Sequence, residues 1–169
     1  MTVSLNTKDY IQEVVDDFGE DVSQMELTPA ARWLFAVSDD RKLKGEQVET
    51  FSSLVAKLLW VCQRGRMDCS PAVDFLCTRV KSPDVEDWKK LKRLISFLHQ
   101  TIDDIRIIGA DDLLKMQTFI DFSHAVHEDM KGHTGGTITF GTGIVSVKSS
   151  KQKMDLQSSN ETEVIGTIN

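Results

Sequence analysis

The chain has 169 residues, of which 40% are hydrophobic and 27% charged, and its formal net charge is −6. This length suits one domain or two small ones, the acidic balance argues against an indiscriminate coat on nucleic acid, and no apolar run approaches the roughly 20 residues that span a bilayer. Because the N-terminus also lacks the basic start and apolar centre of a secretion signal, we expect a cytoplasmic or nuclear protein without a membrane partner.

Helical periodicity dominates residues 7–101, where apolar residues recur at intervals of three and four. A short strand at Thr2–Leu5 precedes the first helix, which Thr7 caps and Gly19 ends. The predicted helices cover Lys8–Phe18, Glu46–Arg64, residues 71–80 behind a Ser70 cap, and residues 83–98 behind a Ser82 cap, the last two with proline at the first helical position.

The cysteines Cys62, Cys69 and Cys77 lie in or beside these apolar patterns. Their number is odd and their spacing is not that of a metal site, so we interpret them as buried reduced thiols.

A row of cations marks the outer side of the last predicted helix. It consists of Lys89, Lys90, Lys92 and Arg93. A solvated helix face and a binding patch are both compatible with this row, and the solvated face is the simpler interpretation.

The apolar period changes from 3.6 to 2 after Thr101, which indicates strands. Gly141-Thr142-Gly143 is typical of a hairpin turn, and a helix that starts near Asn160 behind Ser158 or Ser159 has scarcely begun when the chain stops. We therefore interpret the chain as a fragment of a longer polypeptide. The predicted strands cover residues 105–108, 118–122, 137–140, 144–148 and 154–157.

Asp121 is a carboxylate on an otherwise apolar strand. An ionised carboxylate is costly to bury alone, so it must be exposed, paired or metal-bound. A strand-end aspartate facing water is the common arrangement. The alternative is a Mg²⁺ ligand, with Glu163 of the last helix as the second, because two Mg²⁺ ions about 4 Å apart can organise phosphodiester cleavage.

Three histidines and an aspartate follow the Asp121 strand and could suggest zinc. Their H-x-x-H spacing lies in a loop and is a weak indication, because zinc needs a fixed geometry. We expect surface histidines. The residues concerned are His124, His127, Asp129 and His133.

Residues 130–153 contain four lysines and no acid. This basic hairpin is weak support for a polyanion partner, with Lys148, Lys151 and Lys153 as candidate nucleic-acid contacts. Lysines that protect a solvated strand edge are an equally good interpretation.

The region from Asp121 onward resembles the ribonuclease H region of copia-type retrotransposon Pol polyproteins. That family runs through a strand with Asp, a D-x-x-x-x-T-x-G loop, a glycine turn, a serine/lysine strand and S-S-T-E-A-E. The corresponding stretches here are "DMKGHTGG", "GTG", "VSVKSSKQK" and "SSNETEVIG".

The upstream region resembles the segment that follows the polymerase in the same polyproteins. There, an Arg-x-Asp opens a helix with A-V-x-x-L, and a Trp-containing helix ends in an aromatic-Leu pair and a Thr. The first thirty or so residues resemble the last strand and following helix of the reverse transcriptase. The matching positions are Arg66, Asp68, Ala72, Val73, Leu76, Trp88, Phe97, Leu98 and Thr101.

The resemblance implies three parts and a nuclease site. Residues 1–26 would be the end strand and helix of the reverse transcriptase, 27–103 a helical connection, and 104–169 a truncated ribonuclease H-like domain. The expected fold is α+β, with a helical thumb- or connection-like part before an incomplete antiparallel ribonuclease H-like sheet. Asp121 and Glu163 take the places of two catalytic acids that bind Mg²⁺ for cleavage of RNA in RNA–DNA hybrids.

The departures from the family pattern affect activity. A third acid on a later strand has no counterpart, and Asn160 replaces the usual Thr. We therefore expect a polyprotein fragment that is inactive alone. The alternative is a non-catalytic helical interaction module that packs against the rest of a polymerase and touches nucleic acid weakly through its basic hairpin.

Overall fold

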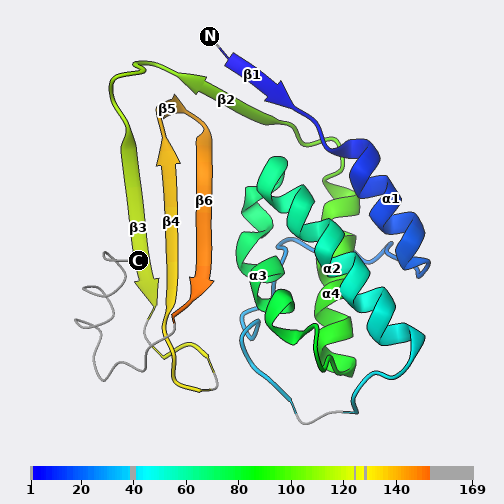
Figure 1. The fold of residues 1–169 in the computed structure, drawn as a ribbon. Coiled ribbons are helices and arrows are strands. Elements are labelled where there is room, and N and C mark those ends of the chain that lie inside the picture. The colour runs from blue at the N-terminus through cyan, green and yellow to red at the C-terminus, as the bar shows by residue number, and fades with distance from the viewer. Residues whose placement is uncertain (1, 39–40, 124, 128, 153–169) are drawn as a thin grey trace. The chain divides into compact units, whose positions relative to one another are not determined.

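The computed structural model describes residues 2–38, 41–123, 125–127 and 129–152, and it divides the chain into two compact units. Residues 5–106 form the helical unit, and the second unit combines residues 2–4 with the chain from residue 107 onward. The predicted α+β class is confirmed (Figure 1). None of the helices in the described part of the chain has the length and apolar character needed to cross a membrane.

The helical unit is built from amphipathic helices that share one core. The apolar stripes predict α1 and α2 with the bounds that the structure has. Gly19 ends α1 in the left-handed conformation, with a φ of 66°, as its place after the last apolar residue predicts. The helices are α1 (Lys8–Phe18), α2 (Glu46–Arg64), α3 (Ser70–Arg79) and α4 (Val85–Gln100), and the 3₁₀ turn η1 covers Met67–Cys69.

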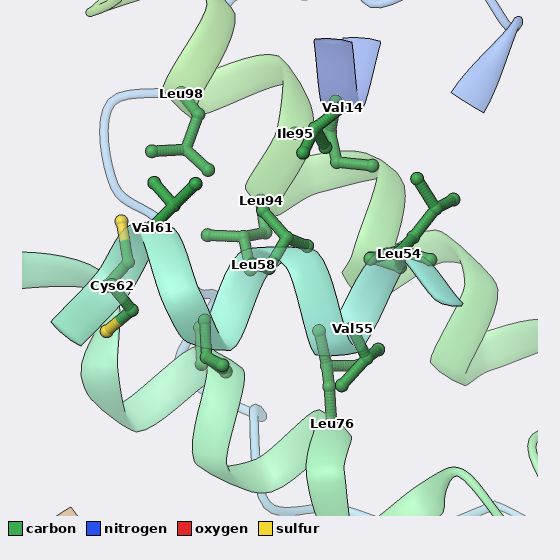
Figure 2. Packing of buried hydrophobic residues seen from close by; sticks show 14 of the residues in the cluster. Val14, Leu54, Val55, Leu58, Val61, Cys62, Leu76, Leu94, Ile95 and Leu98 are labelled. Atoms are coloured by element: carbon green, nitrogen blue, oxygen red, sulfur yellow. The ribbon is translucent and has the colours of Figure 1, made fainter. Parts of the chain in front are cut away.

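Leucine and valine side chains of α2 hold the core of this unit together. Figure 2 shows Val55 of α2 directed toward Leu76 of α3, and Leu58 of α2 next to Leu94 of α4. These side chains are almost fully buried. Burying one side chain of this size stabilises a fold by about 1.5–3 kcal/mol. Helix α1 from the first predicted segment contributes Val14 to the same cluster.

The start of α4 differs from the prediction. Ser82 and Pro83 do not open the helix; its N-cap is Asp84, which forms a capping box with Asp87. The Asp84 carboxylate accepts a hydrogen bond from the Asp87 N–H at 3.0 Å and ion-pairs with Arg79 and Lys42. Asp84 caps better than Ser82 because the same buried carboxylate also neutralises these two cations.

The start of α3 also differs in its cap. Ser70 is the first residue of the helix, and its hydroxyl lies 3.1 Å from the Cys62 sulfur.

Cys62 and Cys69 are buried and Cys77 is partly buried, and all three are free thiols, as predicted. Burial raises the pKa of the Cys62 thiol to about 11, so this thiol is protonated and unreactive at neutral pH.

Arg66 forms a buried polar centre beside this core. Its side chain is 4% exposed, and its guanidinium donates to both carboxylate oxygens of Asp68, at 3.0 and 2.8 Å. The third nitrogen, Nη1, donates to the Thr101 carbonyl at 3.0 Å, and the guanidinium carbon lies 5.3 Å from the centre of the Phe97 ring. Four positions that carry the resemblance in the upstream region therefore meet at one point.

Gly65 is required at the end of α2 because another segment lies directly against it. A Cβ at this position would stand 2.4 Å from the Cγ2 atom of Thr7, which is closer than real atoms approach. Thr7 precedes α1, so the absent side chain of Gly65 lets the start of α1 pack against the end of α2.

The second unit contains two three-stranded sheets within the described residues. One has the order β1-β2-β5 and the other β3-β4-β6. In the second sheet both neighbouring pairs are antiparallel. The strands are β1 (Thr2–Leu5), β2 (Arg106–Ala110), β3 (Gln117–Ser123), β4 (His133–Thr139), β5 (Gly141–Thr142) and β6 (Ile144–Lys151).

Four strands, β2, β3, β4 and β6, exceed their predicted lengths. Strand β4 begins at His133 instead of residue 137, because Gly135 and Gly136 lie inside the strand and pair with β3 and β6. The predicted turn at residues 141–143 does connect β4 to β6, but its first two residues also pair with β2. Gly141 and Gly143 have φ angles of 122° and 73°, which favour glycine at this sharp change of direction. The predicted strand at 154–157 and the last helix lie outside the described residues.

Substitution of Arg66 by alanine tests the buried polar centre. Because Asp68, the Thr101 carbonyl and the Phe97 ring all lose their partner, we expect the free energy of unfolding to fall by about 2–4 kcal/mol. Urea unfolding followed by circular dichroism measures this change. The matched control is Arg64→Ala two residues earlier on an exposed position, for which we expect a change within about 0.5 kcal/mol. Equal stabilities of the two variants would contradict the role given to Arg66.

Candidate functional site

Asp121 lies in the middle of β3 with its side chain exposed to water. One of its carboxylate oxygens accepts the N–H of Phe122 at 2.9 Å. In the sheet register Asp121 stands opposite Gly135 of β4. A Cβ at Gly135 would meet only the Asp121 carbonyl oxygen, at 3.9 Å, so the space beside the carboxylate on β4 is open.

The register of the sheet decides which residues share a face with Asp121. Gly135 stands opposite Ser149 of β6, and His133 stands opposite Lys151. Because directly paired residues of antiparallel strands lie on the same side of the sheet, Asp121, Ser149, His133 and Lys151 share one face. Lys148 pairs with Gly136 and therefore lies on the other face.

A chain of two imidazoles and one hydroxyl crosses this face. Nε2 of His127 lies 3.2 Å from Nδ1 of His133, and Nε2 of His133 lies 2.7 Å from the Ser149 hydroxyl. His127 is only 6% exposed and His133 is half-buried. The expectation of surface histidines is therefore wrong for these two residues, because the sheet register places His133 beside Ser149 and the loop turns His127 onto it.

Burial determines the charge of the two rings. Burial, followed by the positive charge of Lys151 and the proximity of His133, lowers the pKa of His127 to about 4. Burial also lowers the pKa of His133 below its usual range. Both imidazoles are consequently neutral at pH 7, and each holds one N–H and one lone pair.

The described residues contain no group of three or more His, Cys, Asp or Glu side chains that could hold a metal ion. His124 and Glu163, named as candidates from the sequence, lie outside those residues. Of the two predicted carboxylate ligands, the structure therefore places Asp121.

The described lysines of the predicted basic hairpin lie on both faces of the sheet or next to an acid. Lys151 ion-pairs with Asp129 at 2.8 Å, and Lys131 lies 3.7 Å from the same carboxylate. Lys148 is exposed on the opposite face from Lys151, and Lys153 lies outside the described residues. Asp129, which balances the charges of Lys131 and Lys151, lies immediately before the lysine-rich residues 130–153.

The cations on α4 hold the connection between α1 and α2 in place. Lys92 pairs with Glu20, Arg93 with Glu26, and Lys90 donates to the Ala36 carbonyl while lying over the Phe75 ring. Lys89 pairs with Glu86 on its own helix. These contacts give the cation row a structural role within the helical unit.

Sequence reasoning missed two features of the Asp121 face. The alternation of β4 indicates that His133 and Gly135 share a side, but only the register reveals Ser149 as their neighbour. The closeness of His127 to His133 depends on the loop between them, where Met130 has a positive φ of 58°. A positive φ at a non-glycine residue has no reliable indication in one sequence.

Known proteins similar to this chain come from transposons and from a plant mitochondrion. The chain is 28% identical over 170 residues to the retrovirus-related Pol polyprotein from transposon TNT 1-94 of Nicotiana tabacum, an alignment that covers 95% of this chain and 12% of that protein. It is 32% identical over 114 residues to an uncharacterized mitochondrial protein of Arabidopsis thaliana, covering 67% of this chain and 47% of that one. No family model and no solved structure matches.

A third relative extends the same pattern. The chain is 23% identical over 152 residues to a putative transposon Ty5-1 protein of Saccharomyces cerevisiae, covering 89% of this chain and 48% of that protein. The chain thus spans less than half the length of each of these relatives. The matches confirm the resemblance to copia-type retrotransposon Pol polyproteins.

The pKa of His127 makes the stability of the second unit depend on pH. An unfolded histidine takes up a proton near pH 6.5, whereas folded His127 does so only near pH 4. The unfolded state therefore binds more protons between these values, and stability is complete above pH 6.5 and falls as the pH drops toward 4. We expect His127→Gln to reduce this fall in urea unfolding series, while His99→Gln leaves it in place. A His127 ring that titrates near pH 6.5 by NMR would contradict the prediction.

Proposed function

We propose that this chain, a relative of retrotransposon Pol polyproteins, corresponds to the part that runs from the end of the reverse transcriptase through a helical connection into a ribonuclease H-like domain. The proposal follows the order of the motifs along the chain. It is supported by the alignment of 95% of the chain with a transposon Pol polyprotein and by the α+β order of helices and strands.

The single observation that carries the nuclease relationship is the position of Asp121. The family resemblance assigns an acid to the first ribonuclease H strand, and here Asp121 is exposed in the middle of β3, beside the open space over Gly135. An exposed carboxylate with room beside it can accept a hydrated cation, whereas a buried carboxylate fixed by an arginine could not.

Asp121 alone fits Mg²⁺ only in part. Mg²⁺ is held by one or two carboxylates together with water and substrate phosphates, so Asp121 could contribute one ligand. Two-ion hydrolysis needs several carboxylates around the ions, and the described residues offer no cluster of that kind. Glu163 would be the second ligand by resemblance. We therefore infer that the chain alone does not cleave RNA–DNA hybrids.

An assay with Mg²⁺ and a labelled RNA–DNA hybrid tests this inference. We expect no cleavage by the full chain above the blank, while a separate reaction with an active ribonuclease H serves as the positive control. A paramagnetic probe tests the ligand role separately: Mn²⁺ should broaden amide NMR signals near Asp121, and Asp121→Asn should remove the effect.

The matched control for both measurements is Asp112→Asn, because Asp112 ion-pairs with Lys115 in the same unit and lies outside β3. Cleavage that Asp121→Asn abolishes and Asp112→Asn keeps would overturn the inferred inactivity while supporting the lineage. Broadening that is the same in both variants would refute Asp121 as a ligand.

A non-catalytic interaction module is the second candidate function. It is favoured by the self-contained core of the helical unit, in which α1, α2, α3 and α4 pack around one apolar cluster. In this case the helical unit contacts the rest of a polymerase, and the second unit contacts nucleic acid through Lys148. Lys148 is exposed on β6 and lies on the face opposite Lys151, whose ammonium pairs with Asp129.

Binding to an RNA–DNA duplex at low salt tests this second candidate, because phosphate contacts are strongest there. We expect weak binding, and Lys148→Ala should reduce the slope of log affinity against log salt by about one. Lys115→Ala, at another exposed lysine of the same unit, is the control and should leave the slope unchanged. If the duplex does not bind at low salt, the nucleic-acid role fails.

A further inference from the structure

The hydrogen-bonded chain on the Asp121 face has the order of a nucleophile, a base and a group that orients the base. The Ser149 hydroxyl lies 2.7 Å from Nε2 of His133, and Nδ1 of the same ring lies 3.2 Å from Nε2 of His127. His133 therefore uses one ring nitrogen toward a hydroxyl and the other toward a fixed neighbour. This connectivity is the one found in serine nucleophiles that an imidazole activates.

The protonation state of the rings fits this order. Because burial lowers the pKa of both histidines, each is neutral at pH 7 and carries one N–H. When Nδ1–H of His133 donates to Nε2 of His127, the lone pair of His133 Nε2 faces the Ser149 hydroxyl. The base is then ready to accept the hydroxyl proton, and His127 holds the ring in the required tautomer.

The position of β4 that stands opposite Ser149 carries no side chain. Ser149 is half-buried and stands opposite Gly135, which contributes no side chain to the face. Beyond Gly135 the same face carries the Asp121 carboxylate, whose negative charge opposes a developing oxyanion. The substrate must therefore be a small neutral acyl group with a good leaving group, because such an ester needs the least stabilisation of the oxyanion.

We propose that Ser149 is a nucleophile that accepts an acyl group from a small activated ester, with His133 as its general base and His127 as a positioning residue. The Ser149 oxygen forms a bond to the carbonyl carbon while its proton passes to Nε2 of His133. The bond from that carbon to the leaving oxygen breaks, the leaving group departs as a phenolate, and His133 releases the proton to water. The products are an ester on Ser149, a phenolate and a proton, with no change of oxidation state.

This inference is independent of the proposed function. It requires neither Mg²⁺ nor nucleic acid, and it uses none of the acids that the family resemblance assigns. The failure of one proposal therefore leaves the other unaffected.

The experiment incubates the full chain with p-nitrophenyl acetate near pH 7.5, follows p-nitrophenolate release, and maps the acetyl group by peptide mass spectrometry. We expect acetylation of Ser149 that Ser149→Ala removes. His133→Gln should slow the reaction at Ser149 by about 100-fold or more, the usual contribution of a general base. His127→Gln should slow it less and shift its pH dependence.

Ser150→Ala is the matched control, because Ser150 is the next residue of β6 and pairs with Thr134 on the opposite face. This variant should keep the wild-type rate at Ser149. The pH profile of the wild-type chain provides a test without any substitution: the rate should fall on acidification with a midpoint below pH 6.5, where His133 takes up a proton.

Three results would overturn the proposal. The first is acetylation of Ser149 no greater than that of Ser150. The second is an unchanged rate in a His133→Gln variant that retains the wild-type circular dichroism spectrum. The third is a wild-type rate that follows hydroxide concentration through the whole range without a plateau.

Discussion

The helical unit depends on the buried guanidinium of Arg66. A buried charge is stable only when its donors are satisfied, and here a carboxylate, a backbone carbonyl and an aromatic ring surround it. Asp68 lies in the 3₁₀ turn after α2, whereas Thr101 and Phe97 belong to the end of α4. One side chain thus fixes the distance between two helix ends that the sequence separates by more than thirty residues. Gly65, its neighbour, admits Thr7 and so brings the start of α1 to the same region.

The sheet β3-β4-β6 organises its chemistry through register. Gly135 is the central position, because it stands between Asp121 on one edge strand and Ser149 on the other. The missing side chain keeps a carboxylate and a hydroxyl on one open surface, while the imidazoles close one end of it. A side chain at Gly135 would lie between these two groups, so glycine is needed at this position to keep the surface between them open.

The sequence predicts the helices of this protein better than the contacts of its strands. Helices α1 and α2 follow from a local apolar period, which a single segment contains in full. The start of α4 was misplaced because the advantage of Asp84 over Ser82 comes from Lys42 and Arg79, which reach it from other segments. Likewise, the residues around Asp121 are enough to predict that it lies on a strand. Its neighbours on β4 and β6 depend on the strand register, which the local sequence does not reveal. The burial of His127 was missed for the same reason.

The division of the chain into two units has a spectroscopic consequence. The chain has three tryptophans, Trp33, Trp60 and Trp88, and all of them belong to residues 5–106. Trp60 stacks on Tyr10, and Trp88 lies against Phe18 and Phe51, so their emission depends on the packing of the helices. Indole fluorescence therefore reports on the helical unit and is silent about the strands. A denaturation curve recorded by emission and one recorded by backbone absorption would coincide only if the two units lose their structure together.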